Sequence, residues 1–255
     1  MSKYFVVSDV HGFLDELLAV LSAKGFDVNN PEHKLVVCGD LLDRGSKAVE
    51  LLEFVKSLDD RFIYVRGNHE DLIFDCYQDL INHCYLVGHH HKSNGTINTL
   101  AQLTGLSETQ VLINTPERNQ LLRDKVYPLI EWIREKSVDY FEFGNYICVH
   151  GWIPCWNHLD NFRDADDSDW KEARWLNGME MWRYPRYRVD GKTIICGHYH
   201  CSWGWSHIRQ ERKEFPQKNR KDWLESFEPF IDDGIMAIDA CTAYTGIVNC
   251  IVLEG

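Results

Sequence analysis

The chain has 255 residues, with 27 lysines and arginines against 39 aspartates and glutamates, and carries a formal net charge of −12. Hydrophobic residues make up 44% and charged residues 26%, which excludes a disordered chain and is typical of one large or two small globular domains. The acidic balance argues against broad binding of nucleic acid or of an anionic membrane, so we expect neither partner. No run approaches the roughly 20 apolar residues of a membrane span, and no signal peptide is visible, so we expect a cytoplasmic protein.

Short β-rich apolar runs alternate with helical patterns along the chain. The first strands are predicted at 4–7, 35–38 and 62–65, with helical patterns between them. This strand–helix–strand repetition predicts a βαβ core whose sheet is covered by helices. Later strands are predicted at 140–143, 146–149, 193–196, 235–238 and 247–253. They arrive in pairs, which predicts a second, more antiparallel sheet and an α/β sandwich.

We predict a single domain, 1–255, with insertions at about 72–137 and 201–232. The first is helical and polar, and His89, His90 and His91 at its centre are predicted to lie in a solvated loop rather than to bind metal. In the second, Trp203 and Trp205 either line a wall for an aromatic ligand or pack the excursion onto the core. The acidic stretch 164–169 lacks the glycine and terminal glutamate of a calcium loop, so we predict the start of a charged helix.

Nine cysteines occur without a Cys-x-x-Cys pair, which favours reduced thiols over a disulfide scaffold. Cys38, Cys148 and Cys196 lie inside apolar strand-like runs, where a free cysteine behaves as a small buried hydrophobic residue.

Polar residues that can bind metal follow five separate predicted strands. In open α/β sheets, sites form at the carboxyl ends of strands, so these side chains are expected to meet in one crevice. Two aspartates, one asparagine and three histidines form a mixed set that suits Mn, Fe, Zn or Co, and one carboxylate can bridge two ions about 3.5–4 Å apart. The segments are SDVHG with Asp9 and His11, GDLLDRG with Asp40, Asp43 and Arg44, GNHE with Asn68 and His69, VHG with His150, and CGHYH with His198 and His200.

In this order, the segments resemble the calcineurin-like metallophosphoesterases, and specifically the phosphoprotein-phosphatase branch. The resemblance implies an α/β sandwich of two mixed β-sheets flanked by helices, here with a helical insertion. One departure is Ser8, where many members have glycine before the first aspartate. That position supplies a turn and not a ligand, so the metal site is still expected.

The resemblance also implies how the two ions are held. One would be bound by Asp9, His11 and Asp40, and the second by Asp40 as the bridge together with Asn68, His150 and His198. The ions would be Mn, Fe, Zn or Co, with Mn expected in vitro, and the nucleophile would be a metal-bound water.

The remaining roles are also implied by the resemblance. Arg44 would clamp the phosphate together with Asn68, His69 would protonate the leaving oxygen, and Asp43 would orient His69. A second phosphate-binding arginine is expected before the last histidine motif, with Arg174 as first choice and Arg183 or Arg186 as alternatives. Apart from the resemblance, His200 lies two residues from His198 and would face away from it on an extended segment, so it is a candidate either for supporting a ligand or for the substrate side.

The sequence therefore predicts a dinuclear-metal-dependent hydrolase of phosphate monoesters, and most specifically a serine/threonine phosphoprotein phosphatase acting on a phosphorylated protein or a small phosphoester. One alternative is a symmetrical diadenosine tetraphosphatase, whose motifs are nearly the same. Another is a phosphate-binding module without turnover, against which the intact His69, Asp43 and Arg44 count.

Overall fold

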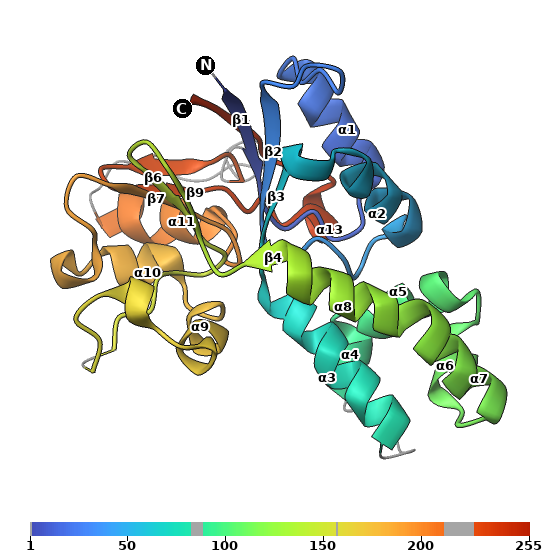
Figure 1. The fold of residues 1–255 in the computed structure, drawn as a ribbon. Helices are drawn as coiled ribbons and strands as arrows, with labels where there is room; N and C mark the ends of the chain where they lie inside the picture. The colour runs from blue at the N-terminus through green and yellow to red at the C-terminus, as the bar shows by residue number, and fades with distance from the viewer. Residues whose placement is uncertain (1, 83–88, 157, 212–226) are drawn as a thin grey trace.

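The computed structural model describes residues 2–82, 89–156, 158–211 and 227–255. At its centre, the first sheet has five strands in the order β10-β1-β2-β3-β4 (Figure 1). The four strands from β1 to β4 run parallel, and β10 pairs antiparallel with β1. Their bounds are β1 (Lys3–Val7), β2 (His33–Cys38), β3 (Phe62–Val65), β4 (Ser137–Val138) and β10 (Ile251–Glu254).

The second sheet has the order β5-β6-β7-β9-β8. It is a mixed sheet: β6, β7 and β9 run parallel, and the edge strands β5 and β8 pair antiparallel with their neighbours, so antiparallel pairing is more frequent than in the first sheet, as predicted. Long connections between β6, β7 and β9 return the chain to the same edge, as parallel pairing requires. The strands are β5 (Phe141–Phe143), β6 (Tyr146–Cys148), β7 (Thr193–Cys196), β8 (Phe230–Asp232) and β9 (Ile235–Ala237).

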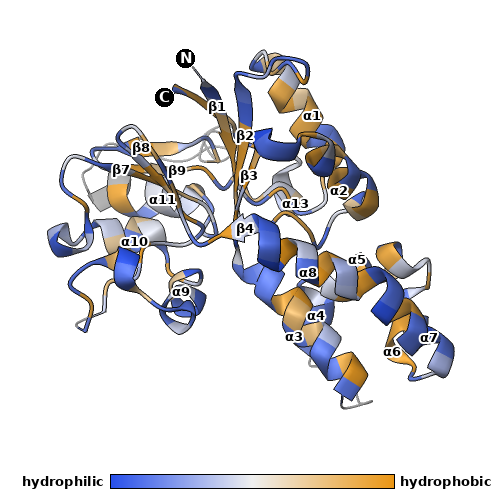
Figure 2. Ribbon diagram, viewed as in Figure 1, coloured by the Kyte–Doolittle hydropathy of each residue, from blue (hydrophilic) through white to orange (hydrophobic). Residues whose placement is uncertain are grey.

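The apolar residues form three layers, as expected for two sheets packed face to face and covered outside by helices (Figures 1 and 2). Side chains that alternate along β1 belong to two of these layers. Phe5 packs towards the helices, whereas Tyr4 and Val6 pack between the sheets. Cys38 and Cys148 lie between the sheets, and both are buried as predicted. The α/β sandwich expected from the motifs is thereby confirmed.

Helices α1 (Leu14–Ala23) and α2 (Ala48–Ser57) cover the outer face of the first sheet (Figure 1). The described residues between β3 and β4 are almost all helical, as predicted for 72–137, although the first helix begins at Asn68. This region consists of α3 (Asn68–Asn82), α4 (His89–Ser93), α5 (Thr96–Thr104), α6 (Glu108–Leu112), α7 (Pro116–Leu121), the π-helix η2 (Leu122–Val126) and α8 (Tyr127–Lys136).

The solvated loop predicted around the three histidines is wrong. These residues begin α4, and His91 is buried, with its Nε2 atom 3.8 Å from Asp79 Oδ2. His89 and His90 are exposed, so the prediction of solvent exposure holds for these two side chains and fails for His91. Packing of α4 against the rest of the helical region buries the third ring.

Of the remaining helices, α9 (Asp167–Ala173) confirms the predicted charged helix start. Asp166 caps it and accepts from the Asp169 N–H at 3.0 Å, while the Asp169 side chain accepts from the Asp166 N–H. The others are α10 (Gly178–Trp182), α11 (Ser202–Glu211) and α13 (Thr242–Thr245), with short turns η1 (Asp59–Arg61), η3 (Phe162–Asp164) and η4 (Pro185–Tyr187). Across the described parts of the chain, none of the helices has the length and apolar character needed to span a bilayer.

Only part of the predicted excursion 201–232 can be assigned, since 212–226 lie outside the described residues. In α11, Trp203 and Trp205 both pack against the hydrophobic cluster of the second sheet. The Trp205 ring also meets Phe230 edge-on, with the ring centroids 5.7 Å apart. Of the two alternatives for this pair, the structure favours packing.

Candidate active site

The predicted ligands follow the carboxyl ends of strands from both sheets. Asp9 and His11 follow β1, Asp40 follows β2, and His150 and His198 follow β6 and β7. Eight non-glycine residues in the described chain have positive φ, and six of these are predicted site residues: Asp9, His11, Asp40, Asp43, Arg44 and His198. Such backbone is uncommon and costly, and its concentration here supports a functional site.

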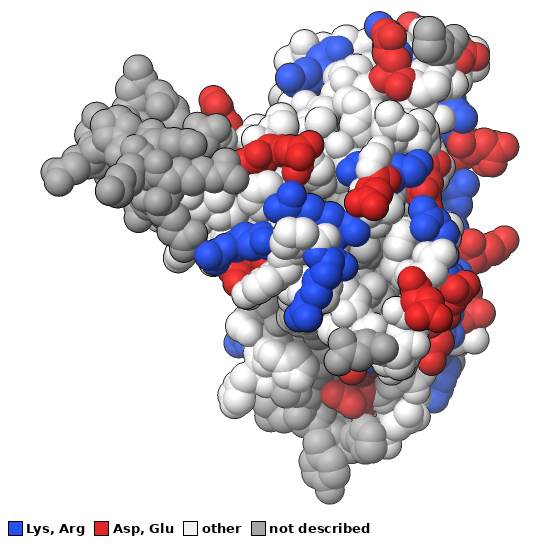
Figure 3. Space-filling view, turned by 90° about the vertical axis from the view of Figure 1, so that its left-hand side faces the viewer, with Lys and Arg blue, Asp and Glu red and all other residues white. Residues whose placement is uncertain are grey.

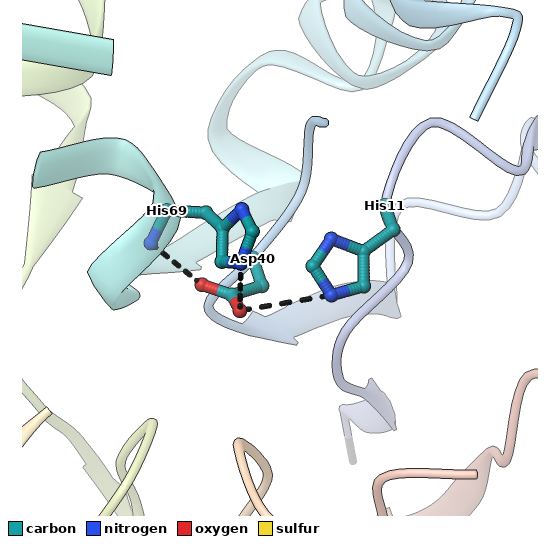
Figure 4. Close-up of side chains that lie close together, drawn as sticks. All are labelled: His11, Asp40 and His69. Carbon is teal, nitrogen blue, oxygen red and sulfur yellow. Dashed lines mark hydrogen bonds and ion pairs between the residues drawn. The ribbon is translucent and has the colours of Figure 1, made fainter. Parts of the chain in front are cut away.

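Asp40 lies at the centre of this site (Figure 4). One carboxylate oxygen, Oδ2, is 3.7 Å from His11 Nε2 and 3.8 Å from His69 Nε2. The other, Oδ1, is 3.3 Å from His150 Nε2 and accepts the His69 backbone N–H at 3.0 Å. Asp40 therefore belongs to two groups of possible metal ligands, in each of which the ligand atoms lie within 4.8 Å of one another: His11, Asp40 and His69, and Asp40, His150 and His198.

The two other predicted ligands adjoin these groups. Asp9 Oδ1 is 4.0 Å from His11 Nε2, and Asp9 Oδ2 accepts the backbone N–H of His198 at 3.0 Å. Asn68 Oδ1 lies 2.7 Å from His150 Nε2. Ser8, expected only to form a turn, also donates its hydroxyl to Asp9. The structure thus brings all six predicted ligands together.

The chemistry of this donor set fits metal ions. Burial lowers the pKa of His198 to about 2 and that of His11 well below its usual value, which favours the neutral imidazole that binds metal. Burial, with Asp9 and Glu70 nearby, raises the pKa of Asp40, so its ionised form needs a compensating cation.

The distal nitrogens of two histidines are held by backbone carbonyl groups. His11 Nδ1 is 3.0 Å from the Leu42 oxygen, and His150 Nδ1 is 2.9 Å from the Cys38 oxygen. Such contacts fix the ring orientation and turn Nε2 towards the other predicted ligands.

His69 and Arg44 form the edge of the site. His69 Nδ1 is 2.8 Å from Asp43 Oδ2, and the Arg44 guanidinium lies 2.9 Å from His11 Nε2 and 3.1 Å from His69 Nε2. Burial lowers the pKa of His69, but Asp40 and Asp43 outweigh it, so the net shift is upward. Arg44 is exposed, and an anion entering the site can therefore reach it.

Sequence reasoning missed the residues that hold Asp43. The hydroxyl groups of Thr96 and Thr99 donate to its two carboxylate oxygens at 2.9 and 2.8 Å, and the Asp43 N–H donates to Thr99 at 3.0 Å. Both threonines lie on α5, so the helical region contributes directly to the site. The sequence feature that could have indicated these two threonines is their i, i+3 spacing, which places both hydroxyl groups on one face of a helix.

Two buried carboxylates were also missed. Glu70, the last residue of GNHE, accepts the backbone N–H groups of Gly67, Asp40 and Leu41 and so holds the loops that carry the ligands. Asp239 follows β9 and accepts the Cys241 N–H at 2.6 Å, and burial together with Asp9 raises its pKa. The signal for Asp239 was its place directly after a predicted strand.

Arg174 is buried in ion pairs, 2.8 Å from Asp71 and 2.5 Å from Asp139. These contacts give it a structural role, and its binding of phosphate stays a prediction. Of the alternatives, Arg183 pairs with Glu180 at 3.1 Å, and the Arg186 guanidinium stacks on Tyr187.

His200 is exposed, and its Nδ1 atom lies 3.0 Å from the hydroxyl of Ser202. The structure therefore gives it a contact on its own turn, and a substrate-side role for it stays a prediction.

A cavity of about 630 Å³ lies beside the second sheet, and none of the predicted ligands lines it. Its lining includes Arg163, Arg186 and Arg188. On the face shown in Figure 3, lysine and arginine side chains gather near the centre, with acidic side chains around them. The net negative charge of the chain is therefore unevenly distributed.

Gly197→Ala is expected to disturb the ligand Asp9. A Cβ atom at Gly197 would lie 1.7 Å from Ser8 Oγ and 2.2 Å from Asp9 Oδ2, so the carboxylate must move. We expect fewer than two bound ions per chain by metal analysis and a loss of about 1–3 kcal/mol in the free energy of unfolding. Gly191→Ala is the control for metal content, because no atom lies within 4 Å of its Cβ position; its φ of 69° strains alanine, so it can lose stability but should keep both ions. Full metal content in Gly197→Ala would contradict the placement of Asp9.

Comparison with known proteins gives matches across most of the chain. The family model described as calcineurin-like phosphoesterase matches residues 2–232. The symmetrical bis(5'-nucleosyl)-tetraphosphatase of Nitrosospira multiformis is 30% identical over 154 residues, covering 60% of this chain and 45% of that protein. The asymmetrical bis(5'-nucleosyl)-tetraphosphatase PrpE of Bacillus subtilis is 34% identical over 116 residues, covering 42% and 44%. The chain thus matches less than half the length of these relatives.

Among solved structures, a cold-active protein tyrosine phosphatase aligns with a TM-score of 0.53 at 17% identity, covering all of this chain and 74% of that one. A likeness at this identity shows the fold alone.

Proposed function

Because the chain belongs to the calcineurin-like phosphoesterase family, we propose that it hydrolyses dinucleoside tetraphosphates symmetrically, converting diadenosine tetraphosphate and water into two molecules of ADP. The observation that carries this proposal is the similarity to proteins named as symmetrical bis(5'-nucleosyl)-tetraphosphatases. A serine/threonine phosphatase activity, the first expectation from the sequence, rests on motif resemblance alone. The proposed function is therefore the symmetrical diadenosine tetraphosphatase that the sequence analysis gave as an alternative.

The site residues fit phosphate transfer to water. The family implies divalent metal ions, which when bound polarise a phosphate oxygen and make water acidic. Arg44 presents a planar guanidinium at the exposed edge of the site, a shape that matches two phosphate oxygens. His69, oriented by Asp43, holds a proton at Nε2 for the leaving oxygen.

The test compares three substrates with Mn²⁺-loaded protein: diadenosine tetraphosphate, a phosphoserine peptide and p-nitrophenyl phosphate. We expect the highest kcat/KM on the dinucleotide, with ADP as the sole nucleotide product by chromatography. Activity should be lost with a chelator and restored with metal.

Other outcomes would overturn the proposal in distinct ways. Equal amounts of ATP and AMP would indicate asymmetrical cleavage, and a preference for the phosphopeptide would restore the serine/threonine phosphatase interpretation. Phosphate binding without turnover of any substrate would indicate the non-catalytic module.

A further inference from the structure

Two exposed aromatic side chains lie beside the predicted metal ligand His198. The Trp175 and His198 ring centroids are 5.6 Å apart at an interplanar angle of 85°, and the Tyr199 ring lies 5.1 Å from the same imidazole at 70°. They come from different parts of the chain, since Trp175 precedes α10 and Tyr199 follows β7. Both rings therefore lie directly beside one of the predicted metal ligands.

The exposure of Trp175 is unusual for this chain. Its exposed fraction is 48%, whereas Trp152, Trp170 and Trp182 are at most 3% exposed. Of the tryptophans that the structure describes, Trp175 alone is exposed, and Tyr199 is 37% exposed. Single exposed aromatic rings are common, as Tyr127, Tyr184 and Tyr244 show. What distinguishes Trp175 and Tyr199 is their position beside a polar site, where they offer a surface for a flat ligand group.

The main chain of Trp175 has a separate task. Its backbone contacts the imidazole of His198, whereas the indole ring meets the imidazole plane at 85°. Because the backbone contact does not depend on the side chain, changing the indole should leave the histidine in place. The role of the ring can then be tested apart from metal binding.

We propose that Trp175 and Tyr199 form the stacking surface for the nucleobase of a substrate whose phosphate chain lies at the predicted metal ligands. The substrate class is thus a nucleoside polyphosphate, which rests on the proposed function and deepens it. An aromatic face binds any base, because every base has a π-face, so this surface gives preference for nucleotides over other phosphate esters. Trp175 is in this sense a specificity-determining residue.

The test measures binding of ADP and of inorganic pyrophosphate to Mn²⁺-loaded protein by calorimetry. Pyrophosphate keeps the charged groups but lacks the base. In Trp175→Leu, the Kd for ADP should rise about 5- to 150-fold, the range for loss of one base stack, while the Kd for pyrophosphate stays unchanged. Trp175→Phe should restore most of the ADP affinity, and Tyr199→Leu should give a smaller loss of the same kind.

Tyr184→Leu is the matched control, because Tyr184 is 47% exposed and its ring contacts only Tyr187 among the described aromatic rings. Unchanged ADP affinity in Trp175→Leu, or an equal loss for ADP and pyrophosphate, would overturn the stacking role. The binding assay requires no turnover. A base-dependent loss with no hydrolysis of diadenosine tetraphosphate would therefore support the stacking surface and reject the proposed activity alone.

Discussion

Asp40→Asn is expected to leave the protein with less than one bound metal ion per chain and to reduce hydrolysis of every substrate at least about 100-fold. The carboxylate belongs to both groups of possible ligands, and its two oxygens face different histidines. Two adjacent cations repel each other and need an anionic oxygen between them. A neutral amide of the same size cannot supply that charge.

Metal analysis after dialysis, with hydrolysis measured on the same samples, checks this prediction. Asn68→Ala is the comparison, since the Asn68 side chain lies 2.7 Å from His150, a member of one ligand group, and should affect one ion more than the other. Two ions retained per chain in Asp40→Asn would show that Asp40 is not the bridge.

His69→Asn is expected to slow hydrolysis of a phosphoserine peptide about 10²–10⁴-fold, the usual contribution of general acid catalysis. A serine alkoxide is a strong base and must be protonated as the bond breaks. Both p-nitrophenolate and the ADP released from diadenosine tetraphosphate are weaker bases, so the losses on these substrates should be much smaller. Asp43→Asn should give a milder form of the same asymmetry, because Asp43 acts through the 2.8 Å contact to His69 Nδ1.

Metal content separates this role from its alternative. His69 Nε2 also lies within reach of His11 and Asp40 as a possible ligand. If His69→Asn retains two ions and loses more activity on the phosphoserine peptide than on the other substrates, His69 acts as the general acid. Equal losses on all substrates with an ion missing would make His69 a ligand instead.

The strand-end residues of the site could be predicted because parallel strands bring their carboxyl ends to one edge. Asp9, Asp40 and His150 illustrate this, since each follows an apolar run that the sequence marks clearly. The same runs predicted the sandwich. Strands β4 and β8 were missed because they have only two and three residues, too few to show the alternation of apolar and polar residues that marks a strand.

Contacts that depend on tertiary packing could not be predicted. Arg174 looked available for phosphate, but its partners Asp71 and Asp139 are 103 and 35 residues away along the chain. His91 looked solvated in a polar run, yet helix packing buries it. In both cases the local sequence was polar, and only the arrangement of distant segments decided what each side chain touches.

The two threonines of α5 limit how far the helical region can be exchanged by protein engineering. A chimaera that replaces α4 to α8 would remove the hydroxyl groups that hold Asp43, even though both sheets and all six predicted ligands, including Asn68 on α3, were kept. Gly95 adds a steric condition, because a Cβ atom there would lie 2.3 Å from the Arg44 backbone nitrogen. A transplanted region would therefore have to supply a hydroxyl pair at i, i+3 preceded by glycine, so this part of the chain is not a freely interchangeable module.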